Sequence, residues 1–590
     1  MKLAVDGLCA STVDHRELFE NVSFNCERGE RVFILGPSGT GKSTLLRVVA
    51  RLHDKTGGSV MLDGSSSSRF VPGSWRARVM YVPQATKNNL PAGPSELLHV
   101  VAKYRAQIRR NQVRKDLLCD FLKKVGLDEA FAEKQWRDMS GGEAQRAALC
   151  VVLSLQPDFL LLDEPTSACD PESTRKVEKT LIESGIGLVW VTHNPEQYKT
   201  VGGRAIHMEP LERSLTPAEP SQIEHKQPDQ VGSHDVEKGL SRSLNRTAKT
   251  AAAAVVSASL IENSHALKAV TGSGGDTEEV SWIGLAEAGL LLIMIALLCS
   301  VFTLGIEGKL VVAGFRSFVQ LLLLGAVLFP VFNINNALLS LGYICIMVLV
   351  AVQEAMSRPS YTFPRMLRCV YLSVGGSIGA FSVFGLFVVL RVGLDARYAV
   401  PLTGMMLGNC LTCISVSLSA LVADLKEKSE VLEHYLSFGA SKYEATKPLL
   451  NSCIRLGLTG QLNQMNVAGI VAIPGMMTGQ ILGGNPPLTA ARYQIFVLLM
   501  NAGTSVIGSF AVMTLTVQEL FDVDHKFVGE ALTKRKNTFS VTSVMEGAIH
   551  WLTDVAKAVV NLLLSKWREF HPAPSPQEFQ PLLSSPPPRN

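Results

Sequence analysis

The sequence predicts an α/β domain followed by an all-α, polytopic membrane domain. Charge separates the two parts, because only 22 of the 108 Asp, Glu, Lys and Arg residues fall between Ser281 and Gln518. A soluble domain carries roughly 25% charged residues, so this segment is far too apolar to be one. Its longest uncharged runs are Ser317–Gln353 and Leu456–Ala491, and each exceeds the roughly 20 residues that cross a bilayer as a helix. Residues 1–212 instead alternate short apolar runs with helical patterns, which is typical of a sheet covered by helices.

The overall composition excludes other classes of protein. The formal net charge is +4, which is too small for a globally basic nucleic-acid binder, and we expect no nucleic-acid partner. Eleven cysteines follow no regular framework, which predicts reduced thiols in a cytosol-facing protein. The N-terminal MKLAVDGLCAS has no signal-peptide apolar core, so we expect the chain to start in the cytosol.

A glycine-rich loop follows the first of three predicted buried parallel strands, at Arg31–Leu35, Phe159–Leu162 and Gly187–Val191. In such a loop the backbone N–H groups converge on phosphate oxygens, and the following helix N-terminus adds positive dipole. We expect Lys42 to reach the β- and γ-phosphates of ATP, and the Ser43 hydroxyl to hold Mg²⁺. The predicted ATP-binding residues are Gly36, Pro37, Ser38, Gly39, Thr40, Gly41, Lys42, Ser43 and Thr44.

The second strand ends in two carboxylates, Asp163 and Glu164. After a phosphate-binding loop, an apolar strand that ends in two acids is typical of nucleotide hydrolysis. We therefore predict that Asp163 associates with Mg²⁺ and that Glu164 is the catalytic group that polarises the attacking water.

Three further elements resemble ABC ATPases. Ser140-Gly-Gly-Glu143 opens a helical pattern and resembles their signature motif, for which the resemblance implies Ser140, Gly141, Gly142 and Glu143 as functional residues. Gln84 resembles the Q-loop glutamine, His193 the switch histidine and 167–170 the D-loop. The resemblance covers residues 1–212. It implies that Gln84 and His193 act with Glu164 in hydrolysis, and that Gln84 also contacts Mg²⁺.

Two features of this resemblance affect the nucleotide site. Glu143 stands where glutamine is usual, and His15 is a weak substitute for the upstream aromatic residue that stacks on adenine. In ABC ATPases the phosphate loop of one subunit closes on the signature of another. Since the chain has one of each, the resemblance implies a homodimer with two composite ATP sites.

Composition divides the rest of the chain. We predict a flexible linker at 213–280, rich in Ser, Thr, Pro, Gly and charge, and a transmembrane permease domain at 281–530. Residues 531–590 are predicted to be a cytosolic tail with an interfacial amphipathic helix at 544–570 and a Pro-rich end. Seven candidate spans lie near 281–304, 310–332, 337–356, 369–390, 398–422, 464–483 and 493–518.

The orientation of these spans contains a conflict. Lys and Arg concentrate in the loops on the side of Arg358–Arg368, which the positive-inside rule places in the cytosol. Seven spans then put Ser281 on the opposite side from the ATPase domain. The first segment does not cross, the linker crosses, or the chain is cleaved, and the sequence leaves these alternatives open.

Two motifs in the apolar part resemble permease sequences. Leu436-Ser-Phe-Gly-Ala-Ser441 resembles the coupling helix of ABC permeases, which implies docking near the Q-loop. The run from Ala472 to Gly484, AIPGMMTGQILGG, resembles the family of bacterial Fet-type iron-export permeases and plant aluminium-tolerance permeases. That resemblance covers about 281–530, and its members pair with a separate ABC ATPase.

Polar and kinked positions are candidates for a transport pathway. Pro474 and its neighbouring glycines should break a span and free backbone groups, which then face protein or water. Ionisable groups within spans are costly and often functional, although each candidate also has a structural interpretation as an interhelical hydrogen bond or a snorkelling end residue. The candidates are Arg316, Gln320, Glu354, Asn409, Met476, Met477 and Gln480, with Gln353, Asn463 and Asn466 as polar companions. Cys410 and Cys413 are interpreted as helix-packing residues rather than soft-metal ligands.

Together these features predict a fused half-transporter that acts as a homodimer in the lipid bilayer, with ATP and Mg²⁺ as cofactors. The resemblance favours export of iron or another metal ion as the small transported substrate. A nucleotide sugar such as UDP-glucose is the alternative, and an ABC-type ATPase regulator without transport is a further one. The Glu578–Leu583 segment resembles an acidic dileucine signal, so both the plasma membrane and a vacuolar or endolysosomal membrane are expected locations.

Overall fold

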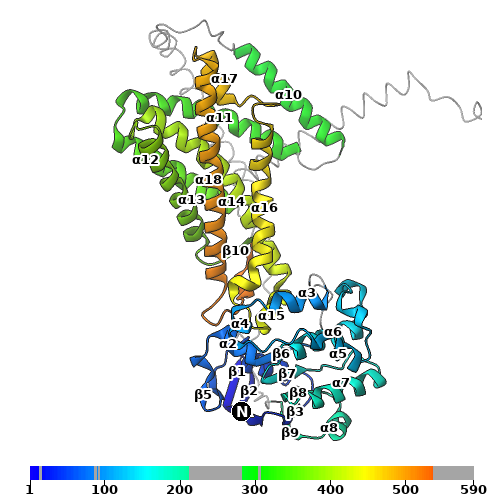
Figure 1. The fold of residues 1–590 in the computed structure, drawn as a ribbon. Helices are drawn as coiled ribbons and strands as arrows, with labels where there is room; N and C mark the ends of the chain where they lie inside the picture. The colour runs from blue at the N-terminus through cyan, green and yellow to red at the C-terminus, as the bar shows by residue number, and fades with distance from the viewer. Residues whose placement is uncertain (12–15, 85–89, 91–92, 211–281, 303–306, 536–590) are drawn as a thin grey trace, which may run out of the picture.

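The computed structural model describes residues 1–11, 16–84, 90, 93–210, 282–302 and 307–535, and it shows an N-terminal α/β domain below a tall helical bundle (Figure 1). The predicted linker at 213–280 and almost all of the predicted tail, including the amphipathic helix and the sorting-signal resemblance, lie outside the described residues.

The three predicted strands lie in one five-stranded parallel sheet, in the order β6-β7-β8-β3-β9. Most of their side chains are buried, because helices cover one face of this sheet while a second, antiparallel sheet and further helices cover the other. Parallel strands end at the same edge, so the segments that follow β3, β7 and β8 meet there. The strands are β3 (Arg31–Leu35), β6 (Val79–Val82), β7 (Phe159–Asp163), β8 (Gly187–Val191) and β9 (Arg204–His207).

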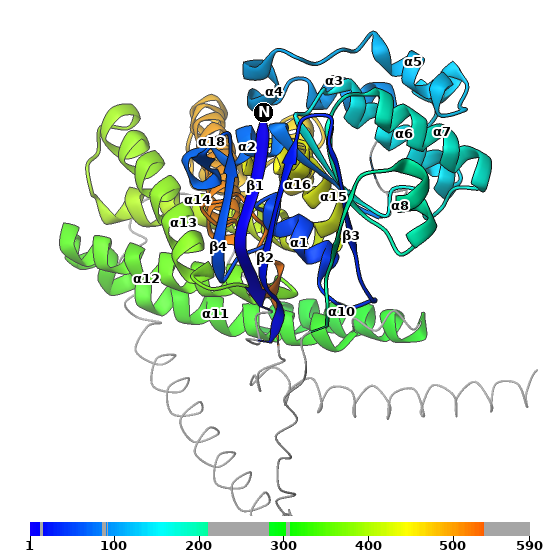
Figure 2. The same cartoon turned by 90° about the horizontal axis from the view of Figure 1, so that it is seen from below.

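A second, antiparallel sheet and a set of helices complete the N-terminal domain. Seen from below, the antiparallel sheet lies to one side and α3, α5, α6 and α7 group on the other (Figure 2). The sheet has the order β2-β1-β4-β5, from β1 (Lys2–Ser11), β2 (Glu17–Glu27), β4 (Gly57–Leu62) and β5 (Ser65–Ser66). The helices are α1 (Lys42–Val49), α2 (Pro72–Arg78), α3 (Pro94–Val101), α4 (Arg105–Arg110), α5 (Leu117–Lys124), α6 (Gly141–Ser154), α7 (Pro171–Glu183) and α8 (Pro195–Val201), with 3₁₀ turns at Ser67–Arg69, Glu129–Ala132 and Trp136–Asp138.

Among the described residues, six helices are long and apolar enough to cross a membrane. They match six of the seven predicted spans, and the helix α13 continues into a π-helical turn at Phe384–Val389. The small and hydroxyl-bearing residues of this bundle pack its helices closely, and Cys410 lies buried where α13, α14 and α18 meet. The six are α10 (Trp282–Val301), α11 (Glu307–Ile334), α12 (Ala337–Ser357), α13 (Met366–Val383), α14 (Ala396–Glu427) and α18 (Pro487–Leu520).

The remaining predicted span, 464–483, is wrong as a continuous helix. Instead α16 (Lys442–Val467) ends where that span was to begin, and the short α17 (Gly475–Leu482) starts after an irregular segment. The expected break at Pro474 is confirmed, since Pro474 caps α17 in an extended conformation. Proline lacks the N–H that would continue a preceding helix and disfavours helical geometry in the residue before it.

The bundle and the N-terminal domain share one continuous apolar core. The helix α15 (Ser429–Ser437) lies between them and contributes Leu432, Tyr435 and Leu436 to that core. After α18 the chain returns to the region between the two domains and forms a 3₁₀ turn at Gly529–Ala531. There β11 (Thr533–Lys534) pairs with β10 (Tyr361–Thr362). The elements that connect the two domains are therefore packed, not merely tethered.

Candidate functional site

The glycine-rich loop between β3 and α1 has the backbone of a phosphate cradle. Gly36, Gly39 and Gly41 all have positive φ angles, of 156°, 84° and 85°. A Cβ atom at Gly36 would overlap the carbonyl oxygen of Met208, and one at Gly41 would lie 3.0 Å from the Phe19 ring. The loop therefore requires glycine both for its curvature and for its close neighbours.

Lys42 folds back over this loop. Its Nζ donates hydrogen bonds to the carbonyl oxygens of Gly36 (2.8 Å) and Pro37 (2.6 Å). Burial lowers the pKa of Lys42, and the carboxylates of Glu164 and Asp163 oppose that shift. The ammonium group is thus held at the mouth of the loop, where a phosphate oxygen would replace the two carbonyls as its partner.

Ser43 and Asp163 meet although 120 residues separate them in sequence. The Ser43 hydroxyl donates to Oδ1 of Asp163 at 3.0 Å, and the Tyr81 hydroxyl donates to Oδ2 at 3.1 Å. Asp163 is buried. Burial of the Tyr81 phenol, together with the Asp163 carboxylate, raises the pKa of Tyr81, so the phenol stays protonated as a donor. A hydroxyl and a carboxylate oxygen side by side form a donor set that suits Mg²⁺.

The three predicted catalytic residues converge on one carboxylate. Gln84 Nε2 donates to Oε2 of Glu164 at 2.7 Å, and His193 Nε2 lies 2.8 Å from Oε1. Glu164 has a φ of 48°, a left-handed conformation that non-glycine residues rarely adopt. Such strain concentrates at active sites, where the surrounding structure holds it in place.

Gln145, a residue that the sequence analysis missed, holds this cluster together. Its Nε2 donates to the backbone oxygens of Gln84 (2.8 Å) and Glu164 (3.1 Å), and its Oε1 accepts from the Ala168 amide at 3.3 Å. Gln145 is buried on α6, two residues beyond the signature motif. The sequence contained one signal that could have identified Gln145: an amide side chain within the apolar stripe of a helix. Such an amide is buried and needs hydrogen-bond partners, which backbone groups can supply.

The signature residues begin α6, as predicted. The Ser140 hydroxyl accepts from the Glu143 amide, and the Glu143 carboxylate accepts from the Ser140 amide at 2.8 Å, which is a capping box. That backbone hydrogen bond lowers the pKa of Glu143, and Lys134 lies 3.6 Å away. Glutamate at this position therefore caps the helix, a role that glutamine can also fill.

Two cavities border the carboxylates, and neither is lined by a signature residue. One of about 440 Å³ lies between Glu164, His193 and the D-loop residue Ser167. The other, of about 270 Å³, lies between Ser43, Asp163 and α15. His15 lies outside the described residues, while Leu18 contacts the phosphate loop at Gly41.

The helix α15 and the turn that follows it dock on the N-terminal domain. Gly73 of α2 and Gly439 approach so closely that a Cβ at Gly73 would lie 2.6 Å from the Gly439 carbonyl oxygen. Buried Gln107 donates to the Phe438 carbonyl at 3.0 Å, and the Arg105 amide donates to Glu444 at 2.9 Å. The predicted coupling sequence therefore lies against the N-terminal domain.

This docking reaches the nucleotide residues directly. Glu433 and His434 of α15 line the 270 Å³ cavity together with Gln84 and Asp163. Glu433 also pairs with Arg47 of α1 at 3.1 Å, only four residues beyond Ser43. An ion pair and a shared cavity thus connect α1 and Gln84 to α15.

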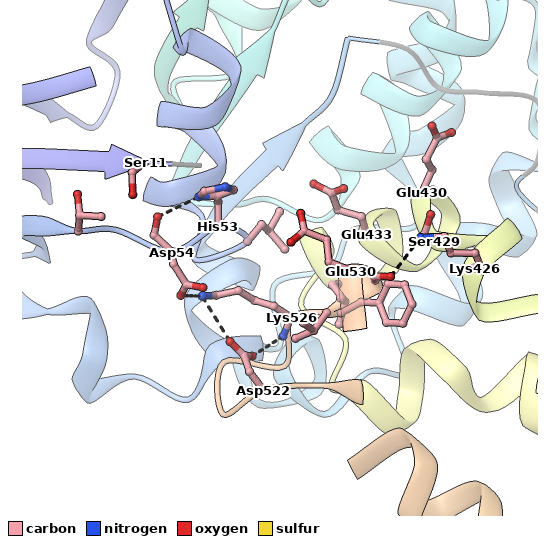
Figure 3. Close-up of a pocket in the computed structure, with 16 residues that line it drawn as sticks. Ser11, His53, Asp54, Lys426, Ser429, Glu430, Glu433, Asp522, Lys526 and Glu530 are labelled. Atoms are coloured by element: carbon pink, nitrogen blue, oxygen red, sulfur yellow. Dashed lines mark hydrogen bonds and ion pairs between the residues drawn. The ribbon is translucent and has the colours of Figure 1, made fainter. Parts of the chain in front are cut away.

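The segment after α18 makes a second contact with the N-terminal domain, which the sequence analysis also missed (Figure 3). Asp524 forms an ion pair with Arg51, and its carbonyl oxygen accepts from Arg76 at 2.5 Å. Lys526 pairs with Asp54, across a cavity of about 650 Å³ that the two domains share. Arg76 is fully buried, and burial lowers its pKa to about 10, so it remains charged near neutral pH.

The predicted pathway residues fall in four separate places. Arg316 and Glu354 come together at 3.6 Å between α11 and α12, and Arg358 lies 3.7 Å from the same carboxylate. Asn409 donates to the Met405 carbonyl within α14 at 3.1 Å. The others do not join these groups: Gln320 is exposed on α11, and Met476, Met477 and Gln480 lie half-buried on α17.

His434, at the contact between the two domains, should make the folded structure less stable at acid pH. Burial lowers its pKa to about 4 from an ordinary 6.5, so the unfolded chain binds the extra proton between these values. The contribution of neutral His434 to the free energy of unfolding is then fully present above pH 6.5. It is lost as pH falls toward 4, by about 1 kcal/mol at pH 5.5. Urea unfolding in detergent at pH 7.5 and 5.5 measures this loss. His434→Gln should show a smaller loss than the parent by that amount, and equal losses would contradict the assignment.

Comparison with known proteins agrees with this geometry. The family model "ABC transporter" matches residues 19–167, and the model "Uncharacterised protein family (UPF0014)" matches residues 282–521. The UPF0014 membrane protein slr1647 of Synechocystis is 30% identical over 250 residues, which cover 42% of this chain and 94% of that protein.

Two further relatives match parts of the chain. The probable iron export ATP-binding protein FetA of Escherichia coli is 34% identical over 185 residues, covering 31% of this chain and 80% of FetA. Protein ALUMINUM SENSITIVE 3 of Arabidopsis thaliana is 34% identical over 227 residues, covering 38% of this chain and 81% of that protein. The chain thus belongs to the ABC transporter family through its N-terminal ATPase and to the UPF0014 membrane protein family through its helical bundle, which makes it a multi-pass membrane protein that couples ATP hydrolysis to transport.

Proposed function

We propose that this chain is one half of a homodimeric transporter that exports a metal ion, iron being the leading candidate. The observation that carries the transport mechanism is the shared cavity in which α15 faces Ser43, Gln84 and Asp163. A helix continuous with the membrane bundle therefore forms one wall of the nucleotide site. The domain boundaries that go with this proposal are 1–212, 213–280, 281–530 and 531–590.

The described residues fit ATP and Mg²⁺. The glycine cradle and Lys42 would hold the phosphates, while the Ser43 hydroxyl, Asp163 and Gln84 would hold Mg²⁺. Bound there, the ion would neutralise charge on the β- and γ-phosphates. Tyr81 keeps one oxygen of Asp163 engaged, so the carboxylate keeps its orientation.

Glu164 is the proposed group that accepts a hydrogen bond from the attacking water. Gln84 and His193 each hold one of its oxygens, and the strained backbone points the side chain at the end of the sheet where the phosphate loop begins. Gln145 fixes the backbone on both sides of this contact, so it is a positioning residue.

The other half of each ATP site should come from a second chain. The signature residues line neither cavity beside Glu164 and Asp163, although each chain carries one signature and one phosphate loop. Two chains that face each other supply two complete sites. Closure of the pair would then move both α15 helices, through the Arg47–Glu433 ion pair and the Gly73–Gly439 contact.

Support for a metal substrate comes from the names of the relatives, iron export in Escherichia coli and aluminium sensitivity in Arabidopsis. A nucleotide sugar is the second candidate, because the described residues contain no group of three or more His, Cys, Asp or Glu side chains that could hold a metal. Such a solute would rely on polar hydrogen bonding instead. The proposed location is the plasma membrane or a vacuolar or endolysosomal membrane, with the ATPase in the cytosol.

Transport can be tested with the purified full chain in proteoliposomes. With ATP and Mg²⁺ added on the ATPase side, Fe²⁺ should raise ATP turnover several-fold and accumulate inside the vesicles, whereas Zn²⁺, Mn²⁺ and UDP-glucose serve as parallel arms. Stimulation and uptake with UDP-glucose alone would replace the metal by the second candidate. ATP hydrolysis without uptake in any arm would contradict a transport role.

A further inference from the structure

The helix α16 has a polar face that the described part of the chain leaves uncovered. Its opposite faces pack against α14 and α18, alongside which it runs through the bundle (Figure 1). The uncovered residues recur every three or four positions, which places them on one side of a helix. They are all exposed, and we call them the α16 polar face: Ser452, Arg455, Thr459, Asn463 and Asn466.

The depth of this face follows from its contact with α14. A Cβ atom at Gly457 would overlap the Ser417 hydroxyl and lie 2.8 Å from the Cys413 carbonyl oxygen, so Gly457 is level with these residues. The helices are antiparallel and rise about 1.5 Å per residue. Asn463 is therefore level with residues near 409, which is close to the middle of the uncharged stretch 398–423 of α14.

Exposure of the α16 polar face to lipid is energetically unfavourable. Among the described residues, neither Asn463 nor Asn466 has a side-chain hydrogen bond, and Arg455 has no ion-pair partner. Only Thr459 is satisfied locally, since its hydroxyl donates to the Arg455 carbonyl at 2.8 Å. Within a membrane helix an arginine costs up to about 2.5–3.5 kcal/mol, the value at the centre, and an unpaired amide in hydrocarbon is also unfavourable. These side chains therefore require water or another protein surface.

A second copy of the chain is the occupant that fits. The proposed function already requires two chains, because each supplies one phosphate loop and one signature. Direct contact of two such faces would bring like-charged Arg455 side chains together, which is unfavourable. Two faces separated by water satisfy the amides and keep the guanidinium groups apart.

We infer that the α16 polar faces of two copies line a water-filled path between them, and that this face, more than Met476, Met477 or Gln480, forms the wall of the transport route. The inference rests on the proposed homodimeric transporter. It assigns the translocation surface to the helix that continues from the coupling segment, so a shift of α15 acts on the path without an intervening element.

Cysteine accessibility in lipid nanodiscs tests this placement. Asn463→Cys is compared with Ile507→Cys on α18, which is exposed and apolar. The two positions match in depth, because a Cβ at the adjacent Gly508 would lie 2.8 Å from Cys410 Sγ, near the same level of α14. A charged, membrane-impermeant methanethiosulfonate is added, and the modified peptides are quantified by mass spectrometry. The native cysteines are common to both variants and serve as internal references.

Asn463→Cys should react at least ten times faster than Ile507→Cys, and a short bifunctional methanethiosulfonate should join two copies only in the former. Equal rates would overturn the water-filled path, and fast reaction without joined copies would overturn the second-copy wall. Both variants must remain monodisperse with an unchanged melting temperature, and Asn466→Cys replaces Asn463→Cys if the latter does not. Slow labelling in a protein that transports contradicts only this inference. Absent transport with fast labelling contradicts the proposed function and leaves only the water-filled path between two copies.

Discussion

Replacing Glu164 with glutamine is expected to lower ATP turnover by about 10²–10⁴-fold, the range that a positioned acid–base group contributes. The substitution keeps the shape and the reach of the side chain: its carbonyl oxygen can still accept from Gln84, and its NH₂ group can donate to His193 Nε2 when that nitrogen carries no proton. What is lost is the carboxylate charge that polarises water. Nucleotide binding should persist, because the glycine loop and Lys42 are untouched. Steady-state phosphate release and equilibrium binding of a fluorescent ATP analogue measure the two properties.

The control is Glu172→Gln, which makes the same chemical change on an exposed helix. Glu172 pairs only with Lys176, one turn along α7, and such a pair contributes a few tenths of a kcal/mol. Its turnover should match that of the parent chain. If Glu164→Gln hydrolyses ATP within threefold of the parent, another residue activates the water and the assignment of Glu164 is wrong.

Replacing Gly73 with alanine is expected to uncouple the two domains. Alanine suits the helical backbone at this position, but its Cβ would lie 2.6 Å from the Gly439 carbonyl oxygen, which must retreat. Overpacking of this kind typically costs about 1–3 kcal/mol, and a cost of about 1.4 kcal/mol lowers the equilibrium constant for docking about tenfold. Hydrolysis residues are not displaced, so ATP turnover should continue while substrate-stimulated turnover and vesicle uptake fall, by up to about tenfold.

A matched control is Gly379→Ala on α13, where a Cβ meets open space. It should leave uptake unchanged, since alanine in a helix is if anything stabilising. Cross-linking between the domains reports docking independently of activity. Full coupling in Gly73→Ala would show that the close approach of α2 and residue 439 does not transmit the conformational change.

Several parts of the nucleotide site were predictable from sequence because they are short and local. The loop from Gly36 to Ser43, the acids that end β7 and the serine that caps α6 each act through neighbouring backbone. Their strand and helix context is visible in the hydrophobic pattern. Glu143, a departure from the usual glutamine, likewise makes its helix-capping contact only three residues away.

Other parts were not predictable, because they depend on residues that the chain brings together from far apart. Gln145 joins the segments of Gln84 and Glu164 only once the sheet has formed. Asp524 reaches Arg51 and Arg76 across more than 400 residues. The prediction of a continuous span at 464–483 was wrong for a related reason. Hydropathy identifies an apolar run, whereas the path of the backbone depends on Pro474 and on what α16 packs against.

The sequence by itself determined the class of the protein: its charge distribution separates a soluble ATPase from a membrane part, and its phosphate loop, paired acids and signature define the hydrolytic chemistry. Only the tertiary structure decided how the two parts contact each other and which face of α16 the described residues leave polar. The physical reason is that motif chemistry is encoded within a few residues, whereas the Gly73–Gly439 approach, the Asp524 contacts and the uncovered side of α16 are properties of packed surfaces.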